Sequence, residues 1–94
     1  MKVLEYIKQS LLNLDFEISE HAYFRALSRE ISLLDIQEIT ENIEIIEDYP
    51  NDKYSPSALL LGWNKLFRPM HIQVTSNTSK QIKIITIYEP TLEK

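Results

Sequence analysis

The segment SEHAYFRALSREIS, residues 19–32, places His21, Arg25 and Arg29 four residues apart. On a helix that turns about 100° per residue, these three side chains and Ser28 fall on one narrow polar arc. The rest of the circumference is mostly apolar, so the sequence predicts a deeply packed helix that presents a cationic stripe. Arginine donates two parallel hydrogen bonds and keeps its charge, which makes phosphate the natural ligand of such a stripe.

A second group of polar side chains is predicted on a sheet. In the segments 69–75 and 82–88, His71, Thr86 and Tyr88 alternate with apolar residues, so they are expected on the face that the helices leave open. This arrangement requires the helices to cover Met70, Ile72, Val74, Ile85 and Ile87. Strict alternation also places Ile82 and Ile84 on the Thr86 face, which makes that face less polar.

The periodicity of the chain changes near Glu44. Apolar residues at helical spacing predict helices over about residues 2–14, from the N-cap Ser19 to about Ser28, and from the N-cap Ser32 to a left-handed stop at Asn42. The third helix has Asp35 at its capping-box position and an apolar stripe of Leu33, Ile36, Ile39 and Ile43. A short strand is indicated at 16–18, and alternation predicts four strands at 44–49, 57–63, 69–75 and 82–88.

Short links between these four strands predict an antiparallel meander. Helices followed by strands indicate an α+β fold, with the helices packed on one face of a four-stranded antiparallel sheet. The apolar segment Leu59–Leu61 needs cover on both faces, which either a central strand position or a partner surface provides.

Composition limits the class of protein. With 94 residues, the chain is expected to form a single domain, residues 1–94. It has no cysteine and two histidines, so a closed zinc site, disulfides and thiol chemistry are not expected. No signal peptide and no membrane span are predicted, and a soluble cytoplasmic protein that needs no cofactor is expected.

The charge is unevenly distributed along the chain, although its total is only −4. Residues 31–52 hold seven acidic side chains and no basic one: Asp35, Glu38, Glu41, Glu44, Glu47, Asp48 and Asp52. Basic residues predominate after residue 52, so one basic face on an acidic protein is one reading, and mixed solvated charges are the other. Arg25 and Arg29 then either bind a ligand or form salt bridges with the acidic block and join two helices.

Five segments of the chain, SEHAYFRALSREIS, EIIEDYP, LLLGW, RPMHIQV and IITIYEP, resemble an uncharacterised bacterial domain family. Its pattern is an S-x-H-A-x-x-R helix, a later H-h-x-h strand (h is hydrophobic) and a closing T-h-Y-x-P. That family is similar to the RelE/ParE/BrnT-like toxins of toxin–antitoxin systems, in which helices pack on a twisted antiparallel sheet. The resemblance implies RNA and an antitoxin protein as partners, and its pattern matches at His21, Arg25, Arg29, His71, Thr86 and Tyr88.

Ribonuclease chemistry without a metal requires a base, an acid and cations around the phosphate. Histidine suits both proton-transfer roles, so His71 and His21 are predicted as the proton-transfer pair, with Arg25 and Arg29 as a phosphate clamp. Tyr88 is predicted to orient a group or to stack on a base. Trp63 is a second candidate for stacking, and Thr86 is expected to contact substrate.

Two other functions stay open on the sequence. A non-catalytic interaction module on the same fold would bind a protein partner or form a homodimer, with the acidic block attracting a basic partner. A small metal site formed by His21 or His71 with Asp48 is the third interpretation. An enzyme needs the two histidines near one another in a cleft open to solvent, whereas a module does not.

Overall fold

The computed structural model describes residues 4–51, 55–76 and 81–90, so Val3, Asp52 and the predicted turn residues 77–79 lie outside the described residues. Within these ranges no helix is long and apolar enough to cross a membrane. The described residues form three helices and five strands: α1 (Leu4–Leu12), β1 (Phe16–Ile18), α2 (Glu20–Ser28), α3 (Leu33–Thr40), β2 (Glu44–Tyr49), β3 (Ser57–Trp63), β4 (Pro69–Ser76) and β5 (Ile82–Tyr88).

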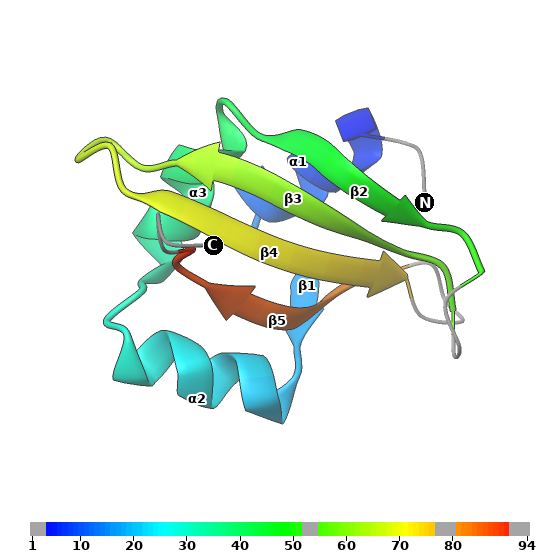
Figure 1. Cartoon of the computed structure of the whole chain (residues 1–94), viewed down its shortest axis with the longest axis horizontal. Coiled ribbons are helices and arrows are strands. Elements are labelled where there is room, and N and C mark those ends of the chain that lie inside the picture. Colours follow the sequence, from blue (N-terminus) through cyan, green and yellow to red (C-terminus); the bar gives the residue numbers. More distant parts are fainter. Residues whose placement is uncertain (1–3, 52–54, 77–80, 91–94) are drawn as a thin grey trace.

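The strands form one mixed sheet in the order β1-β5-β4-β3-β2 (Figure 1). The predicted α+β class and the antiparallel meander β2–β5 are confirmed, but the prediction of a four-stranded, wholly antiparallel sheet was wrong. The short strand β1 adds a fifth member and pairs in parallel with β5, with Phe16 opposite Ile82 and Ile18 opposite Ile84. A parallel pair is allowed here because most of the chain separates the two strands, which leaves ample length for the crossover.

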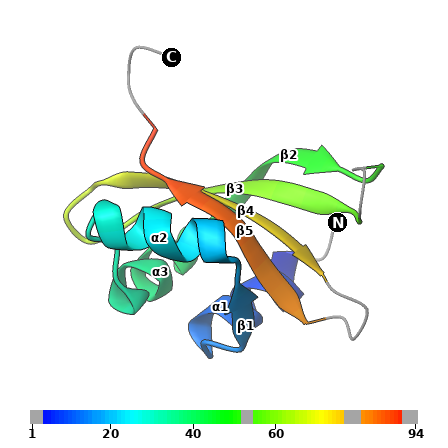
Figure 2. The same ribbon diagram turned by 90° about the horizontal axis from the view of Figure 1, so that it is seen from below.

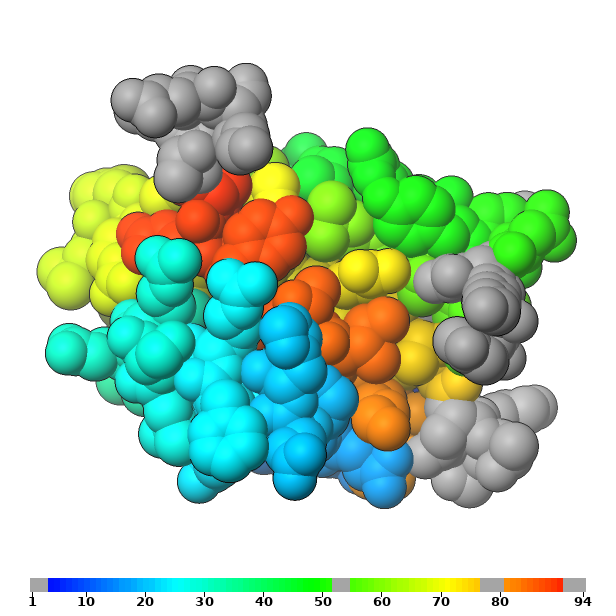
Figure 3. All heavy atoms as spheres, turned by 60° about the horizontal axis from the view of Figure 1, so that its bottom comes forward, coloured from blue at the N-terminus to red at the C-terminus, as the bar shows by residue number. Residues whose placement is uncertain are grey.

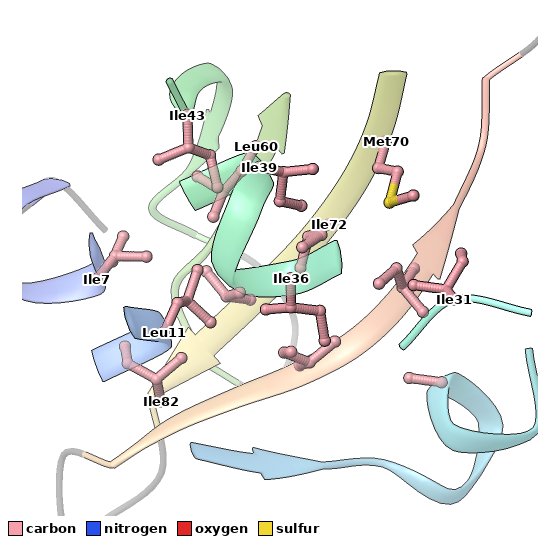
Figure 4. Packing of buried hydrophobic residues seen from close by; sticks show 14 of the residues in the cluster. Ile7, Leu11, Ile31, Ile36, Ile39, Ile43, Leu60, Met70, Ile72 and Ile82 are labelled. Carbon is pink, nitrogen blue, oxygen red and sulfur yellow. The ribbon is translucent and has the colours of Figure 1, made fainter. Parts of the chain in front are cut away.

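Helices α1 and α3 cover one face of the sheet, and the hydrophobic core lies between (Figures 1 and 2). Ile7 and Leu11 of α1 meet Ile36 and Ile39 of α3 above the core side of the strands (Figure 4). The strands contribute fully buried side chains at every second position in β3 and β4, and with one three-residue step in β5: Ala58 and Leu60, Met70, Ile72 and Val74, and Ile82, Ile84 and Ile87. We call the opposite side of the sheet the open face.

The sequence predicted all the helices on one face of the sheet, and this was wrong for α2. Helix α2 does not lie on the covered face with α1 and α3. It runs beside β5 at the edge that the three-residue β1 leaves free (Figure 1). Only Ala22 and Ala26 of this helix are buried, because small side chains allow the helix to approach the strand edge closely. The helix therefore has one flank toward the open face of the sheet.

The third helix begins as predicted and ends differently. Ser32 and Asp35 form the complete capping box, as expected from the sequence. Leu33 was wrongly placed in the buried stripe, since it is 55 % exposed. Asn42 was wrongly expected to be left-handed; its side chain instead exchanges two hydrogen bonds with the backbone of Trp63 and ties the end of α3 to β3.

A β-bulge in β5 decides which side chains reach the open face. Gln73 pairs with Thr86 and Val74 pairs with Ile84, so Ile85 has no partner on β4. The extra residue reverses the alternation, which is why Ile84 and Ile87 are both fully buried. The expectation that Ile82 and Ile84 share the Thr86 face was therefore wrong, as was the placing of Ile85 with Ile87, and the open face is more polar than strict alternation predicts.

Candidate functional site

A histidine–tyrosine pair lies on the open face. His71 of β4 is the direct cross-strand partner of Tyr88 of β5. The His71 Nδ1 lies 3.0 Å from the Tyr88 hydroxyl, and the two rings meet edge to face with centroids 5.1 Å apart. Because the two side chains are direct cross-strand partners and touch each other, their relative orientation is fixed by the sheet register.

The hydrogen bond admits two arrangements of the His71 proton. If Nδ1–H donates to the Tyr88 hydroxyl, Nε2 is free to accept a proton; if the hydroxyl donates to Nδ1, Nε2 carries the proton. Burial lowers the pKa of His71 below the ordinary 6.5, and the nearby Glu47 carboxylate only partly opposes this effect. His71 is therefore mostly neutral at pH 7 and is suited to accept a proton.

The other two open-face candidates lie beside this pair. Thr86 stands two positions before Tyr88 on the same face and opposite Gln73. Trp63 lies opposite Pro69, 38 % exposed, so it borders His71 on the side away from Thr86. A side chain or base lying over His71 would therefore find an aromatic ring on two sides.

Helix α2 carries the cationic stripe and is anchored to the bulge of β5. Ser19 is its N-cap and accepts from the Ala22 backbone N–H. The same residue donates its backbone N–H to Ile84 and its hydroxyl to the carbonyl of Ile85. From this anchor α2 runs in the same direction as β5 (Figure 1).

The direction of α2 determines where the stripe points. With Ala22 and Ala26 turned to the strand, a right-handed helix running beside β5 in this way turns His21 and Arg25 toward the open face. His21, Arg25, Phe24 and Ser28 line a shallow depression of about 410 Å³. In Figure 3 the side chains of α2 meet the red end of β5 on this surface.

The two arginines have different surroundings. Among the described residues, Arg25 makes no salt bridge, and the acidic block contributes no ion pair to α2. The expected alternative, in which both arginines join α2 to that block, is not what the described residues show. Arg29 lies close enough to Glu89 for its charge to help lower the pKa of that carboxyl, so its own charge is partly offset.

The two histidines belong to separate groups on the same side of the molecule. His71 stands on β4, and His21 stands on α2, with β5 lying between these elements. No hydrogen bond joins the two imidazoles in the described part of the chain, and His71 is not among the residues that line the depression. A ligand that used both histidines would have to extend across Thr86 and Tyr88.

One ion pair near the site had not been anticipated from the sequence. Arg68 donates from Nε and from a terminal nitrogen to the two carboxylate oxygens of Glu89, at 3.1 and 3.0 Å. This two-pronged hydrogen bond with Arg68 is the main cause that lowers the pKa of Glu89. It ties the start of β4 to the residue after β5, next to Tyr88. Arg68 and Glu89 stand inside RPMHIQV and IITIYEP, so the sequence signal was their place in two segments that had already been singled out.

The interpretation as a metal site finds no support at Asp48. Asp48 pairs with Ala58 and thus belongs to the covered side of the sheet, whereas His71 pairs with Leu61 on the open face. Among the residues that the structure describes, no three histidine, aspartate or glutamate side chains lie close enough together to hold a metal ion.

Comparison with known proteins gives a family for the chain but no activity. No curated protein and no solved structure matches it. The matching family is the one described as "Domain of unknown function (DUF4258)", and the match covers residues 18–89. This stretch includes α2, α3 and the strands β2–β5, with all the site residues described above. The protein belongs to this family, the domain of unknown function DUF4258.

Proposed function

We propose that the protein is a metal-independent endoribonuclease related to the RelE-like toxins. The observation that carries this proposal is the His71–Tyr88 pair on the same side of the sheet as Arg25, a cation without a carboxylate partner in the described chain. A neutral imidazole and an available guanidinium are the groups that cleavage of a phosphodiester by the neighbouring 2′-hydroxyl requires.

The reaction follows from the roles of these groups. His71 accepts the proton of the 2′-hydroxyl, and the 2′-oxygen attacks the adjacent phosphorus. The bond from phosphorus to the 5′-oxygen breaks, a water molecule supplies a proton to that oxygen, and a 2′,3′-cyclic phosphate remains. Arg25 holds the non-bridging oxygens as negative charge builds up on them, and Tyr88 orients the His71 ring.

His21 and His71 stand on elements that β5 separates, so His21 would contact a neighbouring part of the RNA strand and not the phosphate at His71. Because β5 separates β4 from α2, the RNA strand would lie across Thr86 and Tyr88, with its phosphate at the Arg25 side. Arg29 takes a smaller part in this arrangement, since Glu89 partly offsets its charge.

A cleavage assay tests the proposal directly. The purified protein, in EDTA, is incubated with a fluorescently labelled single-stranded RNA and with the matched all-2′-deoxy strand. Cleavage of the RNA alone is expected, with a 2′,3′-cyclic phosphate end, and His71→Ala should abolish it. Gln73→Ala, next on the same face of β4, is the matched control and should cleave normally. If the folded wild-type protein leaves the RNA intact, the proposal is wrong.

A second function, protein binding, is favoured by the loop between β3 and β4. Leu66 and Phe67 are 77 % and 84 % exposed at its tip. The loop is nevertheless held firmly: the Asn64 side chain accepts from the backbone N–H groups of Leu66 and Arg68, and Glu38 accepts from Lys65. A firmly held loop with two exposed apolar side chains is typical of a contact surface.

The charge around this loop indicates the kind of partner. The carboxylates of Asp35 and Glu38 in α3 contact this loop, so we infer a partner protein with an apolar pocket and a basic rim. Co-expression with the product of each neighbouring reading frame, followed by size-exclusion chromatography, tests this function. Leu66→Ser with Phe67→Ser should dissociate the complex. Concentration-dependent dimers of the isolated protein would instead identify a second copy as the partner.

A further inference from the structure

The depression on α2 combines an exposed aromatic ring with a cation and a hydroxyl. Its four lining residues, His21, Phe24, Arg25 and Ser28, are spaced three and four positions apart and so form one continuous helix face. This surface is separate from the His71–Tyr88 contact, and Phe24 has no part in the reaction described above.

Phe24 is exposed to a degree that packing does not explain. Its side chain is 60 % exposed, and the aromatic contact that it makes in the described chain is an edge contact with the neighbouring Tyr23, at a centroid distance of 5.6 Å and an interplanar angle of 67°. Tyr23 is itself half exposed, so the pair supports the Phe24 ring without covering it.

The polar groups of the depression complement the ring. Arg25 has a guanidinium without a carboxylate partner in the described chain. The Ser28 hydroxyl donates to the Arg25 carbonyl at 3.0 Å, so its oxygen is left to accept a hydrogen bond from a ligand. An inorganic phosphate would use the cation and leave the ring unused, whereas an apolar partner helix would use the ring and bury the cation.

We propose that the depression is a nucleobase subsite, in which a base stacks on Phe24 while its phosphate binds Arg25. This inference rests on the proposed function and specifies its substrate: single-stranded RNA, because a base can reach an aromatic side chain only when it is not paired. The strand would continue from this subsite across β5 toward His71.

Binding, measured apart from cleavage, tests the subsite. The probe is a 5′-fluorescein 2′-O-methyl RNA hexamer, which cannot be cleaved by its own 2′-hydroxyl, and binding is followed by fluorescence polarisation in EDTA. Phe24→Ala should weaken binding about tenfold, the order expected for the loss of one base–aromatic stack. Phe24→Trp should restore wild-type affinity. Leu27→Ala, one turn on and 56 % exposed, is the matched control and should bind as the wild type does.

A duplex competitor separates base stacking from charge attraction. A 12-base-pair RNA duplex should compete weakly, and Phe24→Ala should not change its affinity. Equal binding of the hexamer by the wild type and by Phe24→Ala, with both folded, would overturn the subsite. So would a folded Phe24→Trp protein that binds the hexamer as weakly as Phe24→Ala does.

The outcomes for the subsite and for the enzyme are distinct. His71→Ala should weaken hexamer binding less than Phe24→Ala does, because His71 does not line the depression. Phe24-dependent binding in a protein that cleaves no RNA would confirm the subsite and contradict the enzyme. If the wild-type protein cleaves RNA but its binding of RNA does not depend on Phe24, the enzyme would be confirmed and the subsite contradicted.

Discussion

The hydroxyl of Ser19 donates a 3.2 Å hydrogen bond to the carbonyl oxygen of Ile85, the bulge residue of β5. The same hydroxyl oxygen accepts from the Ala22 N–H and begins α2. One side chain thus joins the start of the helix to the point at which the strand changes its alternation. The bulge sends Thr86 and Tyr88 to the open face, and the N-cap determines where His21 and Arg25 begin to follow them.

Replacement of Ser19 by alanine removes both of these hydrogen bonds. We expect Ser19→Ala to lower the free energy of unfolding by about 1–2 kcal/mol, the upper part of the usual range for an N-cap, in urea denaturation. Ser19→Thr keeps a hydroxyl and should lose much less. A Ser19→Ala protein as stable as the wild type would show that the bulge contact contributes nothing to the docking of α2.

The single glycine of the chain marks the closest approach of β3 to α3. A methyl group at Gly62 would lie 2.5 Å from the backbone oxygen of Ile39 and 3.0 Å from its Cβ. We expect Gly62→Ala to cost about 1–3 kcal/mol, as overpacked cores do, measured by thermal or urea unfolding. Since the nearest atom belongs to the backbone, adding Ile39→Ala should not restore the stability of Gly62→Ala. If the double variant regained stability, the clash would be with the Ile39 side chain.

Local sequence signals predicted most of the elements correctly. The two N-caps Ser19 and Ser32 and the capping-box residue Asp35 act through bonds to residues three positions away, so a short stretch of sequence contains all the required information. The strands β2–β5 alternate clearly enough to be placed within one residue.

Non-local features could not be predicted in the same way. The pairing of β1 with β5 joins segments more than 60 residues apart, and a three-residue strand has too short a pattern to reveal its partner. The bulge at Ile85 depends on the register with β4, which a single strand does not specify. Two errors of the prediction come from this source: the strand at 16–18 was not placed in the sheet, and the polarity of β5 was reversed before the bulge.

The candidate site was predicted by residue type better than by arrangement. The contact between His71 and Tyr88 follows from two strands whose register is fixed across the hairpin. The unequal surroundings of Arg25 and Arg29 depend on Glu89, which lies 60 residues further along the chain than Arg29. Helical spacing treats the two arginines as equivalent, and only the tertiary structure distinguishes them.

The pKa of His71 makes stability depend on pH in a defined direction. Because burial lowers this pKa below 6.5 in the folded protein, the unfolded chain binds the proton more tightly, and stability rises with pH between the two values. The contribution of neutral His71 to the free energy of unfolding is fully present above pH 6.5, and it is lost as the pH falls from 6.5 through the lower pKa of the folded protein. The urea midpoint of the wild type should therefore fall more than that of His71→Gln as the pH is lowered from 7.5 to 5.

Replacement of Glu47 tests which charges set the pKa of His71. Its carboxylate raises the pKa of His71 against the effect of burial, so Glu47→Gln should move the His71 NMR titration to lower pH. Glu41→Gln, at the end of α3, should leave the titration unchanged. A shift to higher pH in Glu47→Gln would contradict this assignment of the electrostatics.

Phe67 has an unfavourable backbone conformation, with φ at 63°. Phenylalanine is uncommon in this left-handed region, and its side chain is 84 % exposed, so little packing compensates. We expect Phe67→Gly to keep or raise the stability, by up to about 1 kcal/mol, in urea denaturation. If stability drops by more than that amount, the phenyl ring supports the fold and is not kept for a partner.

Arg25 and Arg29 should differ in their importance for RNA cleavage. Arg25 has no salt bridge among the described residues. Arg29 lies near the negative charge of Glu89, so Arg25 is expected to attract a phosphate more strongly than Arg29 does. Loss of one charge-stabilising donor typically costs about 10²–10³-fold in rate. We expect a loss of this size for Arg25→Ala and a much smaller one for Arg29→Ala, measured as single-turnover cleavage of labelled RNA.

Growth of cells that express these variants gives the second readout. Induced wild-type protein should arrest bacterial growth, and Arg25→Ala or His71→Ala should relieve the arrest at equal levels of folded protein.

Arg25→Lys keeps the charge and loses the paired hydrogen bonds of guanidinium. If Arg25 holds two oxygens of the phosphate, the rate of RNA cleavage by Arg25→Lys should lie between those of the wild type and Arg25→Ala. Equal losses for Arg25→Ala and Arg29→Ala would show that the two act as one clamp, and that Glu89 does not weaken the second arginine.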